Sequence, residues 1–328
     1  MDGKNTPLPH ERAISQPTTR WPTTPESGVG HPWLGSLLIA ASATAYSTAG
    51  FFTRLIDLDI WTVLFWRGLF AGLFIAGYVI WENGRETAAA VRAIGARGLW
   101  IAFFSTFATI CFLNALRLTT VAEVAVINAT SPFITGALAW LFLGERERWP
   151  TVVASLFALL GVIVMFDPAA SRDHLIGNLL ALVMTISLAA MLVILRHSRA
   201  TSMLPATCLS ALLCPILVWP IANPGAASGK TFIYLALFGV IQFGLGLLLL
   251  TMGTRLVTAI RSSLIKGLQI PLAPAWVWLA FGEVPTLATC IGGLIVVAAI
   301  VCEATCEPIR AAAAVASPPP PRPRCSRL

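Results

Sequence analysis

The chain has 328 residues, of which 57% are hydrophobic and only 11% are charged. Water-soluble domains carry about 25% charged residues, and one aqueous core could not hide this much apolar surface. The composition therefore excludes an ordinary soluble protein and indicates that lipid is the main solvent. The net charge of +7 needs no nucleic-acid partner, because the membrane topology explains it.

Apolar runs of about 20 residues are long enough to cross a hydrocarbon core of about 30 Å. The sequence contains ten such runs with short connections between them: 33–53, 60–81, 99–116, 121–143, 149–166, 175–195, 203–222, 231–254, 257–281 and 286–303. We therefore expect an all-α polytopic membrane protein with ten transmembrane helices. A disordered N-terminal tail is expected over 1–32 and a Pro/Arg-rich tail over 304–328.

One hydrophobic segment occurs twice. Residues 112–149 superpose on 250–287 with a shift of 138 and no gap, and nine of the 38 pairs are identical. Unrelated apolar segments would share roughly three, so duplication is the better explanation. Five spans per half is an odd number, which inserts the halves in opposite directions. The sequence predicts two inverted five-helix repeats, over 33–166 and 175–303.

The distribution of Lys and Arg predicts the orientation in the membrane. With the N-terminus in the cytoplasm, 15 of the 22 basic residues face the cytoplasm and four face the outside. The other three, Arg67, Arg261 and Lys266, fall inside spans. Positive charge accumulates in cytoplasmic loops, so we expect both termini, including the tails 1–32 and 304–328, to be cytoplasmic.

The acidic and metal-binding side chains argue against catalysis. Every Asp lies outside the spans, only Glu123 and Glu303 lie within them, and no Cys/His spacing suggests a metal. An intramembrane transferase would need clustered acids to hold Mg²⁺ and a diphosphate. The ATP-binding motif GxxxxGK[ST] is absent. We expect no enzyme, no metal, no cofactor and no direct use of ATP.

Basic side chains inside the spans are the strongest functional candidates. A Lys or Arg at the centre of a transmembrane helix costs about 2.5–3.5 kcal/mol, so it usually has a partner or a task. Lys266 lies about 14 Å into its span, near the midplane, with no acid of matching depth. The repeat superposes Lys266 on Asn128 and Arg261 on Glu123. This pattern predicts an asymmetric, net positive site for a carboxylate or another anionic group.

Three of the charged residues have alternative interpretations. Arg261 is equally compatible with an ion pair to Glu303, because both lie near the cytoplasmic ends of spans nine and ten. Arg67 precedes a small-residue motif that starts at Gly68, and we assign it to packing rather than ligand binding. Glu123 is the acid best placed for proton coupling, unless it merely faces the outer water.

Prolines interrupt two corresponding spans. Pro132 in span four nearly superposes on Pro271 and Pro274 in span nine. A proline frees a carbonyl that a neighbour or a cavity must satisfy, and paired interruptions in two halves indicate a binding site. We predict hinges at these prolines. Five further polar side chains are candidates for the lining or for hydrogen bonds between helices: Tyr46, Asn114, Ser131, Gln242 and Gln269.

The chain resembles the EamA-type drug/metabolite transporter superfamily over residues 33–303. Three motifs carry the resemblance: FLNALRLTTVAEVAVINATSPFITGALAWLFLGERE, PLAPAWVWLAFGEVPT and FWRGLF. It implies a ten-helix carrier of the bacterial inner membrane, with both termini inside and a central cavity lined by spans one, three, four, six, eight and nine. The chain departs from members that have Glu-Pro near Gln269, and from those with acidic or small residues where Arg261 and Lys266 stand.

We expect a secondary transporter that exports an amino-acid-like or carboxylate-bearing metabolite by alternating access. Two alternatives stay open: an uptake carrier for a vitamin or nucleotide-like solute, and a membrane receptor or accessory subunit without flux. The expected partners are a small-molecule substrate and the lipid bilayer but no nucleic acid, with the assembly open between monomer and homodimer. The candidate binding residues are Lys266, Gln269, Asn128, Glu123, Arg261, Asn114 and Gln242, with hinges at Pro132, Pro271 and Pro274.

Overall fold

The computed structural model describes residues 32–145, 149–165, 175–227, 229–282 and 284–316, and every regular element within them is a helix. The first half contains α1 (Pro32–Ser47), α2 (Ala49–Leu55), α3 (Ile60–Asn83), α4 (Thr87–Ala93), α5 (Gly95–Leu118), α6 (Val121–Ala129), α7 (Ser131–Leu143) and α8 (Trp149–Met165). The second half contains α9 (Leu175–His197), α10 (Leu204–Val218), α11 (Gly229–Leu237), a π-helix (Phe238–Leu245), α12 (Gly246–Thr254), α13 (Ala259–Lys266), α14 (Gln269–Phe281) and α15 (Leu287–Ala316). Short 3₁₀ turns lie at Gly84–Glu86 and Pro224–Ala226.

Within the residues that the structure describes, eight helical stretches are long and apolar enough to cross a membrane. They are Trp33–Leu55, Ile60–Ala93, Gly95–Leu118, Glu123–Leu143, Leu175–His197, Gly229–Thr254, Ala259–Phe281 and Leu287–Ala304. Two shorter apolar helices, α8 and α10, occupy the positions of predicted spans five and seven. Each predicted span thus corresponds to a helix or a broken helix, and the predicted fold class is confirmed.

The last helix continues beyond its membrane span. The apolar span Leu287–Ala304 agrees with predicted span ten, 286–303, and α15 then runs on to Ala316. The extension includes four consecutive alanines, and alanine has the highest helix propensity. The first part of the predicted tail 304–328 is therefore helical. Residues 1–31 and 317–328 lie outside the described part of the chain.

The internal repeat is visible in the helix boundaries. Thr120 and Thr258, which a shift of 138 superposes, are the N-caps of α6 and α13. Each helix ends early, and after a short break α7 or α14 follows. Both α7 and α14 end at a glycine with a positive φ, 67° at Gly144 and 71° at Gly282. Glycine adopts this conformation without steric cost. The two halves therefore share one broken-helix design.

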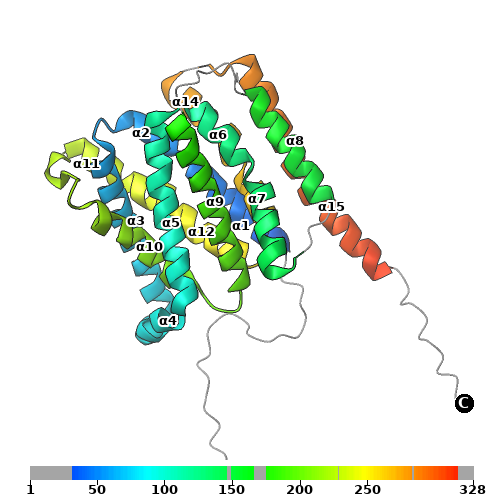
Figure 1. The fold of residues 1–328 in the computed structure, drawn as a ribbon, viewed down its shortest axis with the longest axis horizontal. Helices are drawn as coiled ribbons and strands as arrows, with labels where there is room; N and C mark the ends of the chain where they lie inside the picture. The colour runs from blue at the N-terminus through cyan, green and yellow to red at the C-terminus, as the bar shows by residue number, and fades with distance from the viewer. Residues whose placement is uncertain (1–31, 146–148, 166–174, 228, 283, 317–328) are drawn as a thin grey trace, which may run out of the picture. The chain divides into compact units, whose positions relative to one another are not determined.

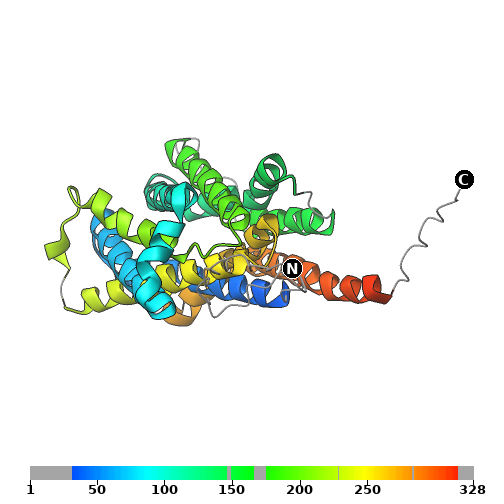
Figure 2. The ribbon, with the colours of Figure 1, turned by 90° about the horizontal axis from the view of Figure 1, so that it is seen from below.

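α8 and α15 run side by side and pack closely along their length (Figures 1 and 2). Gly161 of α8 lies opposite Gly292 of α15 where the two helices cross. A Cβ atom on Gly292 would lie 2.3 Å from the carbonyl oxygen of Gly161, and a Cβ on Gly161 would lie 2.8 Å from that of Gly292. Small residues let membrane helices approach this closely, and the gain is van der Waals contact between their backbones.

Gly292→Ala is expected to lower stability by about 1–3 kcal/mol, because the added methyl group cannot fit unless α8 and α15 separate. Thermal unfolding of the purified protein in detergent should show a lower midpoint than the wild type. Gly77→Ala is the matched control, since a Cβ on Gly77 would have no neighbour within 4 Å. Equal midpoints for Gly292→Ala and the wild type would contradict the close crossing.

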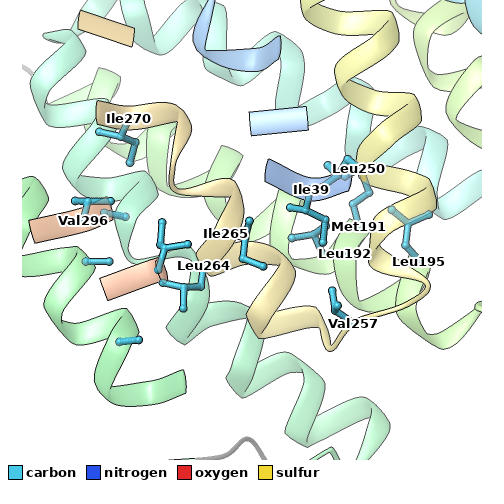
Figure 3. Close-up of a cluster of buried hydrophobic side chains, with 14 of the residues drawn as sticks. Ile39, Met191, Leu192, Leu195, Leu250, Val257, Leu264, Ile265, Ile270 and Val296 are labelled. Atoms are coloured by element: carbon cyan, nitrogen blue, oxygen red, sulfur yellow. The ribbon is translucent and has the colours of Figure 1, made fainter. Parts of the chain in front are cut away.

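One buried hydrophobic cluster connects both parts of the second broken helix to the rest of the bundle. Figure 3 shows Leu264 and Ile265 before the break, Ile270 after it, and Ile39 of α1 close by. Other labelled members are Met191, Leu192, Leu195, Leu250, Val257 and Val296. The cluster holds the segment on either side of the break in place, and so fixes Lys266, which lies between Ile265 and Ile270 in the sequence.

Candidate functional site

A cavity of about 580 Å³ lies between the two broken helices. Its size falls within the range of small-molecule sites. α6 contributes Val124, Ala125 and Asn128, and α14 contributes residues from Gln269 to Val277. The other walls come from α1, α2, α3, α5, α9, the π-helix, α12, α15 and the segment before α15, with Lys266 at the end of α13. Most of these side chains are apolar, so the few polar groups define what the cavity can bind.

The cavity reaches the surface at one end. Arg54, Val284 and Thr286 line it there and are exposed. Toward the other end, α7 packs against α13, and the Ser263 hydroxyl donates a hydrogen bond of 2.8 Å to Ser131 Oγ. No residue of α7 is part of the described cavity lining. The structure therefore has one open end and one closed end.

Lys266 lines the cavity as the last residue of α13. Its Nζ lies 5.6 Å from the ring centroid of Tyr46. Within the described part of the chain it forms no ion pair, so no carboxylate neutralises it. Its position at a helix C-terminus is favourable for a cation, which helps to explain how the side chain is tolerated. Four other polar residues that the sequence offers as candidates line the same cavity: Tyr46, Asn128, Gln242 and Gln269.

Arg261 does not line the cavity. It is buried, and its Nε lies 3.2 Å from Oε2 of Glu303 on α15. Thr151 donates a 3.2 Å hydrogen bond to the other oxygen of Glu303. The structure therefore forms the ion pair that the sequence analysis left open, and this pair ties α13 to the α8–α15 unit.

Glu123 and Asn114 are also absent from the described cavity lining. Glu123 lies in the first turn of α6, where its N–H donates to the Thr120 hydroxyl at 3.1 Å. Its carboxylate accepts a 2.5 Å hydrogen bond from Thr119. An acid at this position stabilises a helix N-terminus. The side-chain amide of Asn114 donates to the carbonyl of Ile110 in its own helix, at 2.8 Å.

The prolines lie just after the helix breaks. Pro132 is in the first turn of α7, where a proline removes no helical hydrogen bond. Pro271 lies in the first turn of α14, and Pro274 lies inside that helix and lines the cavity. The helices are interrupted slightly earlier, at Thr130 and at the residues before Gln269. Bending at these prolines stays a prediction.

Arg67 of α3 lines the cavity, although the sequence analysis assigned it to packing. Its side chain is buried, and the guanidinium carbon lies 4.4 Å from the ring centroid of Phe243 and 5.2 Å from that of Phe238. Among the described residues it makes no ion pair. The sequence feature that indicates a role for Arg67 in the cavity is the same as for Lys266: a basic residue inside an apolar span. Its aromatic partners lie far away in the sequence, so the pattern did not reveal them.

A two-repeat helical membrane protein with a polar group at the centre of a cavity between broken helices has the architecture of a membrane transporter. Residues 33–167 and 175–303 each match the EamA-like transporter family. The chain belongs to the EamA-like transporter family, and it is a multi-pass membrane protein that transports small molecules.

Similar proteins include transporters named for opposite directions. The chain is 25% identical over 276 residues to the S-adenosylmethionine uptake transporter of Rickettsia conorii, covering 83% of this chain and 90% of that protein. It is 23% identical over 197 residues to the pseudopaline exporter of Pseudomonas aeruginosa, covering 58% and 69%. A solved protein structure with 17% identity and a TM-score of 0.71 covers 84% of this chain and 98% of its own, and it shares the fold.

Proposed function

We propose that the protein is a secondary transporter that exports an amino-acid-like or carboxylate-bearing metabolite across a bacterial inner membrane, with both termini in the cytoplasm. The observation that carries this proposal is Lys266, a cation that lines the cavity without a carboxylate partner among the described residues. An anionic group on the substrate would provide the missing counter-charge. The apolar remainder of the wall supports an organic substrate over an inorganic anion.

The arrangement of the broken helices supports alternating access. α7 and α13 pack together at the closed end, whereas α6 and α14 both line the cavity toward the open end. The predicted topology places the open end outside. Because the halves are inverted repeats, exchanging their conformations would bring α6 and α14 together and separate α7 from α13. The cavity would then open to the cytoplasm.

Uptake is the second candidate, and one observation favours it. The relative named as an uptake transporter matches a larger share of this chain than the relative named as an exporter. Metabolite profiling of cells and medium, with and without the gene, separates the two directions. If the protein is an exporter, deleting its gene should lower the amount of substrate in the medium. If it is an uptake carrier, the deletion should leave more of the substrate there.

Lys266→Gln is expected to lower the affinity for the compound found by profiling by about tenfold to a hundredfold, because a hydrogen bond to a charged group is lost. Lys266→Arg should retain part of the affinity. Flux of the labelled compound in reconstituted vesicles measures the effect. Lys230→Gln, an exposed substitution at the start of α11, is the control for lost charge. Full activity of Lys266→Gln would exclude an anionic site at this residue.

A further inference from the structure

Two further polar side chains line the cavity and have no part in the role proposed for Lys266. Arg67 is 4% exposed and Gln242 is 3% exposed, and both line the cavity. Within the described chain, Arg67 Nε has no hydrogen-bond partner and neither does Gln242 Oε1. A buried donor or acceptor without a partner is costly. One is a cationic donor and the other an acceptor, so a single ligand group that both accepts and donates would satisfy them.

The two side chains are held on helices in close contact. A Cβ on Gly239 of the π-helix would lie 2.8 Å from the carbonyl oxygen of Arg67, so the two backbones touch there. Phe238 and Phe243, also on the π-helix, contact the guanidinium of Arg67. These rings stabilise the cation without consuming its N–H groups. A π-helical segment is uncommon and is frequently found at functional sites.

Tyr46 lies close both to the end of the π-helix and to Lys266. A Cβ on Gly246, the residue that follows the π-helix, would lie 3.2 Å from the Tyr46 ring. Lys266 Nζ lies 5.6 Å from the centroid of the same ring. Tyr46 therefore adjoins both Lys266 and the residue that follows the π-helix. Arg67, Gln242 and Lys266 all line the same cavity.

We propose that Arg67 and Gln242 form a second subsite that binds a carboxylate and its neighbouring amino group, while Lys266 binds a separate anionic group of the same substrate. The planar guanidinium of Arg67 suits a carboxylate, and Gln242 Oε1 accepts a hydrogen bond from the amine. The substrate class is then an amino acid derivative with a second anionic group and an apolar body. This inference rests on the proposed transport function.

The test uses compounds of graded charge on the purified, full-length protein. The probes are γ-glutamyl dipeptides with leucine or phenylalanine as the second residue, which carry an amino-acid head and a distant carboxylate. One matched set of analogues lacks the distant carboxylate and another lacks the amino group. Binding is measured by calorimetry. We expect the complete dipeptides to bind more tightly than either analogue, because only they satisfy all three side chains.

Substitutions of the three side chains test which of them binds which group of the ligand. Arg67→Gln should weaken binding of the complete dipeptides by about tenfold to a hundredfold, and Arg67→Lys should weaken it less. Gln242→Leu should affect only compounds that have the amino group, and Lys266→Gln only those that have the distant carboxylate. Arg117→Gln, at an exposed position, controls for lost charge. Size-exclusion profiles and unliganded unfolding midpoints show whether each variant is folded.

Two results would overturn the second subsite. One is equal binding by the wild type and a folded Arg67→Lys or Arg67→Gln variant, with Lys266→Gln still impaired. The second subsite would then be rejected, and the proposed transport of an anionic solute would be kept. The other is the failure of every complete dipeptide to bind while simpler monocarboxylates bind. Loss of all anion dependence, in binding and in vesicle flux, would reject the proposed function as well.

Discussion

Oxidation of the double variant Ser131→Cys/Ser263→Cys is expected to abolish transport. The two hydroxyl oxygens are 2.8 Å apart and join α7 to α13 at the closed end of the cavity. Alternating access requires these helices to separate. A disulfide between them would hold the cavity open only toward the predicted outside. Flux in reconstituted vesicles should fall to the level of empty vesicles and return after reduction.

The two single variants are the controls, because neither can form the cross-link and both should keep their flux after oxidation. Cys290 and Cys302 are exposed in the native chain and should be changed to serine beforehand. Mass spectrometry of the peptides shows how much of the double variant is cross-linked. Normal flux by a fully cross-linked protein would show that α7 and α13 stay together during transport.

The membrane helices and the repeat could be predicted from the sequence, because both depend on local properties. Apolar runs of sufficient length define the spans, and the match between 112–149 and 250–287 indicates the duplication. The structure shows the same relation in the paired caps Thr120 and Thr258 and the paired glycines Gly144 and Gly282. Predicted span ten, 286–303, agrees with the apolar stretch Leu287–Ala304, whereas the helix itself continues to Ala316, because alanines favour a helix beyond its apolar run.

The cavity was harder to predict, because it depends on which side chains meet across helices. Depth in the membrane was enough to single out Lys266. The same criterion left Arg261 undecided, since only the packing of α15 shows that Glu303 reaches it. The small-residue motif that starts at Gly68 favours a packing role for Arg67, and its aromatic partners Phe238 and Phe243 lie on a π-helix that local sequence patterns do not indicate.

Glu303→Gln is expected to destabilise the protein by about 3–5 kcal/mol, because it leaves the Arg261 guanidinium buried without its carboxylate. Both side chains of the pair are only 6% exposed. Thr151 can still donate to the remaining carbonyl oxygen, but that bond does not balance the charge. Thermal unfolding in detergent should show a large fall in the midpoint. Replacing both residues by leucine should recover most of the loss, since the buried charge is removed together with its partner.

The ion pair between Arg196 and Glu145 provides the matched control for this prediction. Its N–O distance is also 3.2 Å, but its side chains are 12% and 28% exposed. Water screens a partly exposed pair, so Glu145→Gln should cost at most about 1 kcal/mol. The difference between the two variants measures the effect of burial at equal N–O distance. Equal midpoints for Glu303→Gln and Glu145→Gln would show that the Arg261–Glu303 pair does not hold α13 against α15.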